Sequence, residues 1–290
     1  MGALILDGSS IAGQIREEIR REALLAGERG IAPFLAVVLV GDDPASVSYV
    51  AGKEKALSQA GLRGKTWRLP ADTTEGELLA LVERLNRDPS VHGILVQFPL
   101  PPQIDENAVL QAISPDKDVD GLTPFNLGLL ASGRPAFVPC TPQGVLALLQ
   151  KAGVAIPGSN TVIVGRSGLV GRPLSILLSS KPWNATVTLC HTGTGNLADH
   201  TRRADILVAA CGVPGFITAE HIKPGAAVID VGVNRVPDSS KKSGFALAGD
   251  VDFAGAREIA SVITPVPGGV GPMTITMLLK NTLRAALRQQ

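Results

Sequence analysis

The sequence predicts an α/β protein of two domains with a cleft between them, the second domain being built on a Rossmann-like parallel sheet. Helix and strand patterns alternate along most of the chain, which is typical of βαβ units. The length of 290 residues fits two modest domains. A stretch rich in Pro, Gly and Asp, residues 98–140, separates two such series. We therefore expect one domain at 1–140 and a second at 141–272, with 273–290 returning to the first.

The elements of the first domain follow from periodicity and from helix caps. Apolar residues recur every four positions from Ile11 to Ala23, after the cap candidates Ser9 and Ser10, and predict an amphipathic helix. The unbroken apolar run 34–40 predicts a strand covered on both faces. The other expected elements are a helix at 45–60, a strand at 65–69, a helix at 74–86 that starts with a capping box of Thr74 and Glu77, a strand at 91–97 and a short helix near 107–113.

The second series begins where Thr141 and Pro142 supply a cap and a first helical residue. Its expected elements are a strand at 161–164 that runs into a glycine-rich turn and a helix from Gly165, strands at 185–190, 206–210 and 227–231, a proline- and glycine-rich run at 265–272 and an apolar helix at 273–287. We expect the last helix to pack on the first domain, because it lies beyond the second sheet.

Composition excludes several classes of protein. Hydrophobic residues make up 45% and charged residues 18%, which allows a buried core and argues against disorder. A net charge of +1 and 3% aromatic residues argue against a nucleic-acid partner. The first residues lack the features of a signal peptide and no apolar run is long enough for a bilayer, so we expect a cytoplasmic protein with no membrane partner. Cys140, Cys190 and Cys211 lack metal-ligand spacing and predict no metal site.

The clearest cofactor motif is a strand followed by Gly165, Arg166 and Ser167 and then by a helix. A helix N-terminus behind such a turn binds phosphate through free N–H groups. The motif departs from GxGxxG, since Ser167 takes the place of the second glycine, and an ordinary strand–turn–helix is the alternative. The next strand ends at residues 190–192 without a carboxylate to hold a ribose 2′-hydroxyl, whereas Arg166 can pair with a 2′-phosphate. Both observations favour NADP.

Polar residues at three places indicate a substrate site. Tyr49 and Lys53 lie four residues apart on a predicted helix and share one face, although a solvated lysine beside a half-buried tyrosine has the same spacing. Gln97 closes an apolar strand at its carboxyl end, where open α/β sheets bind ligands; an amide that caps a loop is the alternative. Three carboxylates within residues 116–120 suit a cation or a polar turn, and they lack the spacing of a calcium loop.

Together these motifs resemble the bifunctional methylenetetrahydrofolate dehydrogenase/cyclohydrolase family, and the match runs over nearly the whole chain. The specific segments are Tyr-Val-Ala-Gly-Lys-Glu-Lys at 49–55, Gln-Phe-Pro-Leu-Pro at 97–101, Lys-Asp-Val-Asp-Gly at 117–121 and Pro-Val-Pro-Gly-Gly-Val-Gly-Pro-Met-Thr at 265–274. Two departures from the family pattern, at 122–123 and at 180–184, touch no matched catalytic position.

The resemblance implies a role for each matched residue. Lys53 would be the catalytic lysine of the cyclohydrolase step with Gln97 beside it, Tyr49 would contact the folate, and Asp120 would hold the pterin ring. The residues implied to contact NADP are Gly165, Arg166, Ser167, Thr192 and Val233. Pro267, Gly268 and Gly269 are implied to contact the substrate, in a run that lines the cleft.

The implied function lies in one-carbon folate metabolism and, through it, in purine biosynthesis. It is the NADP-dependent oxidation of 5,10-methylenetetrahydrofolate to 5,10-methenyltetrahydrofolate, followed by hydrolysis to 10-formyltetrahydrofolate. The family also implies a homodimer. Two rival hypotheses are a different two-domain NADP dehydrogenase, such as a shikimate dehydrogenase-like enzyme, and a non-enzymatic nucleotide-binding regulator. A monofunctional dehydrogenase is the nearest variant, and the presence of Lys53 argues against it.

Overall fold

The computed structural model describes residues 2–241 and 244–289, and the chain divides into two compact units. Unit 1 comprises Met1–Ala12 and Thr141–Thr274, and unit 2 comprises Gly13–Cys140 and Ile275–Gln290. The division after residue 140 coincides with the expected boundary, and the end of the chain groups with unit 2. Residues 2–12, expected in the first domain, group instead with unit 1; residues 1 and 290 of the expected ranges lie outside the described part.

Unit 2 contains a three-stranded parallel sheet in the order β3-β2-β4. Its strands are β2 (Phe34–Val40), β3 (Arg63–Leu69) and β4 (Gly93–Val96), and its helices include α2 (Pro44–Gln59), α3 (Glu75–Arg87), α4 (Glu106–Ala112) and α5 (Pro124–Ala131). The long helices α1 (Gly8–Glu28) and α10 (Val270–Arg288) each begin in unit 1 and continue in unit 2.

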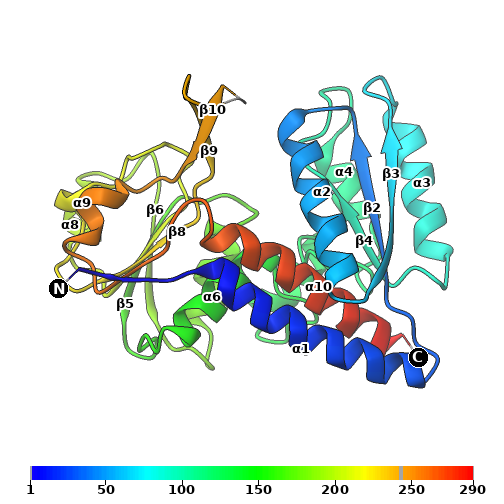
Figure 1. Cartoon of the computed structure of the whole chain (residues 1–290), viewed down its shortest axis with the longest axis horizontal. Coiled ribbons are helices and arrows are strands. Elements are labelled where there is room, and N and C mark those ends of the chain that lie inside the picture. Colours follow the sequence, from blue (N-terminus) through cyan, green and yellow to red (C-terminus); the bar gives the residue numbers. More distant parts are fainter. Residues whose placement is uncertain (1, 242–243, 290) are drawn as a thin grey trace. The chain divides into compact units, whose positions relative to one another are not determined.

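Strand β2 is central and is covered on both faces, as the apolar run predicts. Alternate residues Ala36, Val38 and Val40 pack in one core with apolar side chains of α3 and α4. Helix α2 covers the opposite face, and Figure 1 shows α2 and α3 on the two sides of the sheet. A Cβ on Gly64 in β3 would lie 2.8 Å from Leu57 of α2, so the glycine permits the close approach of that helix.

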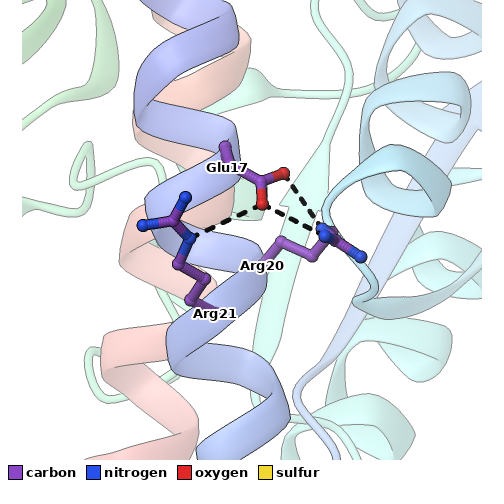
Figure 2. A network of polar contacts seen from close by, with 3 residues as sticks. All are labelled: Glu17, Arg20 and Arg21. Carbon is purple, nitrogen blue, oxygen red and sulfur yellow. Dashed lines mark hydrogen bonds and ion pairs between the residues drawn. The ribbon is translucent and has the colours of Figure 1, made fainter.

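The helix starts are set by local side-chain caps. The predicted capping box of Thr74 and Glu77 is present at the start of α3. At α1 the cap is Asp7 rather than a serine, because its Oδ1 accepts from the N–H groups of Ser9 and Ser10 at 2.9 and 3.1 Å. Further along α1, one exposed carboxylate pairs with two arginines on the following turn, as Figure 2 shows for Glu17, Arg20 and Arg21.

Unit 1 contains a six-stranded sheet in the order β1-β11-β8-β7-β5-β6 among the described residues, and every pairing in it is parallel. Its strands are β1 (Leu4–Ile5), β5 (Asn160–Val164), β6 (Thr186–Cys190), β7 (Ile206–Ala209), β8 (Ala227–Asp230) and β11 (Val262–Ile263). Its helices are α6 (Cys140–Lys151, whose first residue is assigned to unit 2), α7 (Gly171–Ser179), α8 (Leu197–Thr201), the short 3-10 helix η1 (Ala219–His221) and α9 (Phe253–Arg257). β9 (Asn234–Pro237) and β10 (Phe245–Ala248) form a separate antiparallel pair.

The structure differs from the sequence-based expectations at four places. β1 pairs in parallel with β11, which carries the N-terminal residues into unit 1. Helix α7 begins at Gly171 and not at Gly165, since residues 165–170 form a loop. Helix α5 begins with Thr123 as cap and Pro124 in the first turn, inside the stretch rich in Pro, Gly and Asp, where the helix near 107–113 is the one expected. The β9–β10 pair was not predicted either. No helix in the described ranges is long and apolar enough to cross a bilayer.

Candidate active site

Lys53 is a buried lysine on α2. Asp43 caps this helix, its Oδ2 accepting from the Ser46 N–H at 2.8 Å, and Pro44 occupies the first turn. Lys53 lies two turns after Ser46 on the buried face of the helix. Its Nζ donates to Oε1 of Gln97 at 2.7 Å. The helix therefore carries an ammonium group into the interior, where a hydrogen-bond acceptor is needed to offset the loss of water.

Gln97 is placed for this contact by the sheet. It follows β4, and its backbone N–H donates to the carbonyl of Val38 at 2.8 Å, which extends the pairing with β2. Its side-chain Nε2 donates to the carbonyl of Phe98 at 2.6 Å. The two ends of the amide are therefore divided, the nitrogen bonding the loop and the oxygen bonding Lys53. Gln97 therefore both caps the loop, through Phe98, and contacts Lys53.

The surroundings of Lys53 favour its neutral form. Burial lowers the pKa of Lys53, and the charges of Asp120 and, less strongly, Cys140 act in the opposite direction. The net effect is a lowered pKa. The neutral amine is therefore reached at a lower pH than for a lysine in water, which acid–base chemistry near neutral pH requires.

The carboxylates within residues 116–120 have separate environments. Asp118 is buried and accepts from the backbone N–H groups of Gly121, Leu122 and Thr123 at 2.9, 3.2 and 2.9 Å. It also accepts from Nδ2 of Asn126 at 2.8 Å. Asp118 is thus the organiser of a polar turn, which was the second of the two hypotheses for this run.

Asp120 ends this turn close to Lys53. Its side chain is half-buried, whereas Asp116 is exposed. Burial raises the pKa of Asp120, the charge of Lys53 lowers it, and Asp118 raises it further. The following glycine, Gly121, has φ of +73°, and a Cβ there would lie 2.9 Å from the backbone nitrogen of Pro139. Glycine is needed here because the backbone of residues 117–121 passes close to the backbone of Val138 and Pro139, just before α6.

Two buried residues near Asp120 were missed by the motif reasoning as site residues. The Cys140 thiol donates to the carbonyl of Val119 at 3.3 Å, and burial followed by the charge of Asp120 raises the pKa of Cys140 well above its ordinary value. Asn281 of α10 donates to the carbonyls of Val119 and Val138 at 2.8 and 3.2 Å. An asparagine among the predominantly apolar residues of the predicted last helix was the signal available in the sequence.

Tyr49 lies one turn before Lys53 on α2. Tyr49 is 40% exposed and Lys53 is 9% exposed, so the lysine is the buried member of the pair. The alternative of a solvated lysine beside a half-buried tyrosine is therefore wrong, because the lysine is the less exposed of the two. Lys55, two residues further on, is exposed on another face of the helix. The structure thus brings Lys53, Gln97 and Asp120 together and places Tyr49 at the adjacent surface.

The glycine-rich loop of unit 1 has the backbone geometry expected of a close-approach site. Gly165 has φ of +125°, and a Cβ there would collide with the carbonyl oxygen of Ala210. A Cβ on Gly171 would collide with the carbonyl of Gly165. Val170, the N-cap of α7, makes no side-chain capping bond, and Ser167 Oγ accepts from the Val170 N–H at 3.1 Å. The loop and the start of α7 fit a phosphate-bearing cofactor.

The other residues expected to contact NADP lie on loops of the same unit. Arg166 is exposed and forms no ion pair within the described part of the chain. Thr192 is exposed in the loop after β6, and residues 190–192 carry no carboxylate. Val233 follows β8 and is 42% exposed. All of these residues follow carboxyl ends of parallel strands, where open sheets bind ligands.

Pro267, Gly268 and Gly269 form the connection between β11 and α10. The Val266–Pro267 peptide bond is cis, and Gly268 has φ of +104°. The carbonyl of Gly268 accepts from the Ser9 N–H at 3.0 Å. These three residues belong to unit 1, whereas Lys53, Gln97, Tyr49 and Asp120 belong to unit 2.

No group of three or more His, Cys, Asp or Glu side chains suited to a metal ion occurs among residues 2–241 and 244–289. The three cysteines are free.

Comparison with known proteins connects both units to one family. Residues 6–120 match a family model described as the catalytic domain of tetrahydrofolate dehydrogenase/cyclohydrolase. Residues 139–290 match the model described as the NAD(P)-binding domain of the same family. The chain is 55% identical over 286 residues to the bifunctional protein FolD of Pelobacter propionicus, covering 99% of this chain and 98% of that protein.

Solved structures of the same family have the same fold as this chain. A Trypanosoma brucei methylenetetrahydrofolate dehydrogenase-cyclohydrolase (FolD), complexed with NADP cofactor and an inhibitor, has a TM-score of 0.96 at 44% identity, over 99% of this chain and 98% of that one. The bifunctional FolD of Campylobacter jejuni has a TM-score of 0.94 at 43% identity, over 99% and 100%. The chain therefore belongs to the tetrahydrofolate dehydrogenase/cyclohydrolase family.

Proposed function

We propose that Lys53, Gln97 and Asp120 of unit 2 perform the hydrolytic half of a two-step folate reaction and that the loops of unit 1 hold NADP for the oxidative half. The chain is a bifunctional enzyme of one-carbon metabolism. It oxidises 5,10-methylenetetrahydrofolate to 5,10-methenyltetrahydrofolate with NADP and hydrolyses the product to 10-formyltetrahydrofolate. Because the chain belongs to this family, the hypotheses of a shikimate dehydrogenase-like enzyme and of a non-enzymatic regulator are set aside.

In the oxidative step, bound NADP would supply the acceptor for the hydride that leaves the methylene carbon of the folate. The contribution of the chain is to hold the reactants in place. Gly165 and the start of α7 would receive the phosphates, and the Arg166 guanidinium would pair with the 2′-phosphate. Thr192 and Val233 would flank the cofactor from neighbouring loops, and the run 267–269 would contact the substrate. Hydride transfer itself needs no protein proton donor.

In the hydrolytic step, we assign the proton transfers to Lys53. Water adds to the methenyl carbon while the neutral Lys53 amine accepts one of its protons. The bond from this carbon to the ring nitrogen N5 then breaks, and Lys53 returns the proton to that nitrogen. The second proton of the water leaves to solvent as the formyl group forms, so the step balances. Gln97 Oε1 holds the amine in position, and the lowered pKa of Lys53 supplies its neutral form.

Asp120 and Tyr49 are assigned to folate binding. The half-buried Asp120 carboxylate would accept hydrogen bonds from the amino group and a ring nitrogen of the pterin. Tyr49, one turn before Lys53 and 40% exposed, would contact the folate from α2.

The observation that carries this proposal is the 2.7 Å hydrogen bond between the buried Lys53 and Gln97. The test follows methenyltetrahydrofolate in the purified Lys53→Met variant during oxidation of the methylene substrate. We expect hydrolysis to fall by about 10²–10⁴-fold, with part of the oxidation retained, so that the methenyl compound accumulates. Lys55→Met is the matched control, since Lys55 is an exposed lysine on the same helix. Undiminished hydrolysis in Lys53→Met would assign the proton transfer to another residue.

We further propose that the enzyme is a cytoplasmic homodimer. The support is the resemblance to a family whose members are commonly homodimers, together with three free cysteines, which suit a reducing compartment. Light scattering on the purified chain gives its mass directly. A mass close to the 30.0 kDa of one chain over the working concentration range would contradict the dimer.

A further inference from the structure

Asp230 and Asp250 of unit 1 are two buried aspartates to which neither the motifs nor the proposed reaction assigns a role. Asp230 ends β8 and Asp250 follows β10, and their side chains are 3% and 0% exposed. No lysine or arginine pairs with either of them within the described ranges. A buried carboxylate needs hydrogen-bond donors, so the question is where these donors come from.

The donors are mainly backbone N–H groups of the loops at one edge of the sheet. Asp250 Oδ2 accepts from Cys211 and Gly212 at 2.7 and 2.8 Å, in the loop after β7. Asp250 Oδ1 accepts from Nδ2 of Asn234 at 2.8 Å. Through these bonds one side chain ties the loop after β7 to the start of β9.

Asp230 extends the same arrangement. Its Oδ1 accepts from the N–H groups of Gly232 and Asp250 at 3.0 and 2.9 Å, and its Oδ2 accepts from Val251 at 3.0 Å. Two glycines leave room for the pair: a Cβ on Gly232 would collide with the Asp250 carboxylate, and a Cβ on Gly249 would collide with that of Asp230. The carboxylates therefore occupy space that side chains of these loops would otherwise fill.

Of the loops that they hold, the one after β7 lies at the point where the strand order reverses, and the one after β8 belongs to the neighbouring strand. β6 and β7 are neighbours of β5 on opposite sides, and a dinucleotide binds outside the carboxyl ends of the strands at such a switch point. The glycine turn after β5 touches the loop after β7, since Gly165 has no room for a Cβ beside Ala210. Val213 and Val233, on the loops that the aspartates hold, are 48% and 42% exposed.

We propose that Asp230 and Asp250 are positioning residues for NADP, which hold the loops after β7 and β8 in the shape that receives the dinucleotide. The inference rests on the proposed placement of NADP at this edge of unit 1. The pair acts through the backbone, and neither carboxylate is assigned a contact with NADP.

The test compares NADP binding with hydrolysis, because the residues proposed for hydrolysis lie in unit 2. In Asp250→Asn the side chain keeps its shape, but an NH2 donor replaces one of the two acceptor oxygens. The remaining oxygen cannot accept both from the N–H groups of Cys211 and Gly212 and from Nδ2 of Asn234. We expect the Kd for NADP, measured by titration calorimetry without folate, to rise by about tenfold or more. Hydrolysis of methenyltetrahydrofolate without NADP should stay within about twofold of the unmodified protein, because no proposed hydrolytic residue is touched.

Asp205→Asn is the matched control. Asp205 also lies at a strand end of the same sheet, at the amino end of β7, and accepts from the Asn160 N–H at 2.8 Å. It should leave the Kd for NADP unchanged. Gly232→Ala is a second variant that keeps both charges and displaces the Asp250 carboxylate, and it should weaken NADP binding in the same direction.

Each outcome is decisive for the positioning role. An unchanged Kd for NADP in Asp250→Asn overturns it. Loss of hydrolysis in both Asp250→Asn and Gly232→Ala also overturns it, because the pair would then serve folding of the whole chain. Absence of saturable NADP binding by the unmodified protein would instead contradict the proposed cofactor site, so the two failures are distinguishable.

Discussion

The carboxylates of Asp118 and Asp120 stand two residues apart in one turn and differ in what surrounds them. Asp118 accepts three backbone hydrogen bonds, from Gly121 to Thr123, and one from Asn126 at the start of α5. Asp120 lies in the electrostatic reach of Lys53, and each of the two residues shifts the pKa of the other toward its charged form. The turn that Asp118 holds therefore presents Asp120 to the buried lysine.

Substitution of the two aspartates should separate stability from function. Asp118→Ala leaves buried N–H groups without an acceptor, and we expect the free energy of unfolding to fall by about 2 kcal/mol or more. Asp120→Ala should weaken both folate reactions while NADP still binds, with little loss of stability. Denaturant unfolding and the two activity assays measure these effects. Normal folate binding by Asp120→Ala would leave Asp120 as part of the turn only.

The rate of hydrolysis should depend on the ionisation of Lys53. Because burial lowers its pKa, the neutral amine forms below the pKa of a free lysine, about 10.4. We expect kcat for hydrolysis, corrected for the uncatalysed reaction, to rise with pH through this lowered pKa and then level off. Asp120→Asn should move the rise to lower pH, since the Asp120 charge holds the pKa up. A rise that stays in place would argue against the coupling of these two residues.

Cofactor preference should depend on Arg166. Its guanidinium is exposed and forms no ion pair in the described part of the chain, so it is available to a 2′-phosphate. We expect kcat/KM to be higher with NADP than with NAD, and Arg166→Ala to narrow this gap by about tenfold or more. Lys181→Ala, which removes an exposed charge beyond the far end of α7, is the control. Equal use of both dinucleotides by the unmodified protein would contradict the assignment.

Asn281 should matter to the folate site although it lies on the last helix. Asn281→Ala removes the amide donor to the carbonyls of Val119 and Val138, beside the backbone of Asp120, and leaves Val119 with the weaker bond from the Cys140 thiol. We expect a higher KM for folate, a loss of about 1–3 kcal/mol in stability and an unchanged Kd for NADP. Thr282→Val is the matched control, because among the described residues the Thr282 hydroxyl bonds only a carbonyl of its own helix, Leu278, at 2.8 Å. Equal KM values in the two variants would remove Asn281 from the site.

Asp230 predicts a pH dependence of stability in mildly acidic solution. Burial raises its pKa from 3.8 to about 6, so folding favours the protonated form. The stabilisation is fully present below the unfolded pKa and is lost as the pH rises through about 6, by roughly 3 kcal/mol in total. Between pH 4 and pH 6.5 the unmodified protein should lose stability relative to Asp230→Asn. A difference between the two proteins that does not change with pH would contradict this expectation.

Much of the fold could be predicted because its signals are local. The apolar run of β2, the capping box of Thr74 and Glu77 and the glycine turn after β5 each act within a few residues. Pattern failed where partners are distant in sequence: two residues, Leu4 and Ile5, form a strand only because β11 lies beside them. The start of α7 was missed because the loop from Gly165 is held by contact with Ala210, in another strand connection.

The candidate site divides in the same way. The family could be recognised without the structure, because the motifs that contain Lys53, Gln97 and Asp120 are specific. The packing of the fold was needed to show that Lys53 is buried and that Asp118 stabilises the turn, and the expected closeness of Gln97 to Lys53 is a hydrogen bond of 2.7 Å. The structure also revealed Asn281, Asp230 and Asp250, whose hydrogen bonds join segments far apart in the chain. Burial and pKa shifts arise from which segments exclude water from a group, and that depends on packing across the fold and not on the neighbouring residues in sequence.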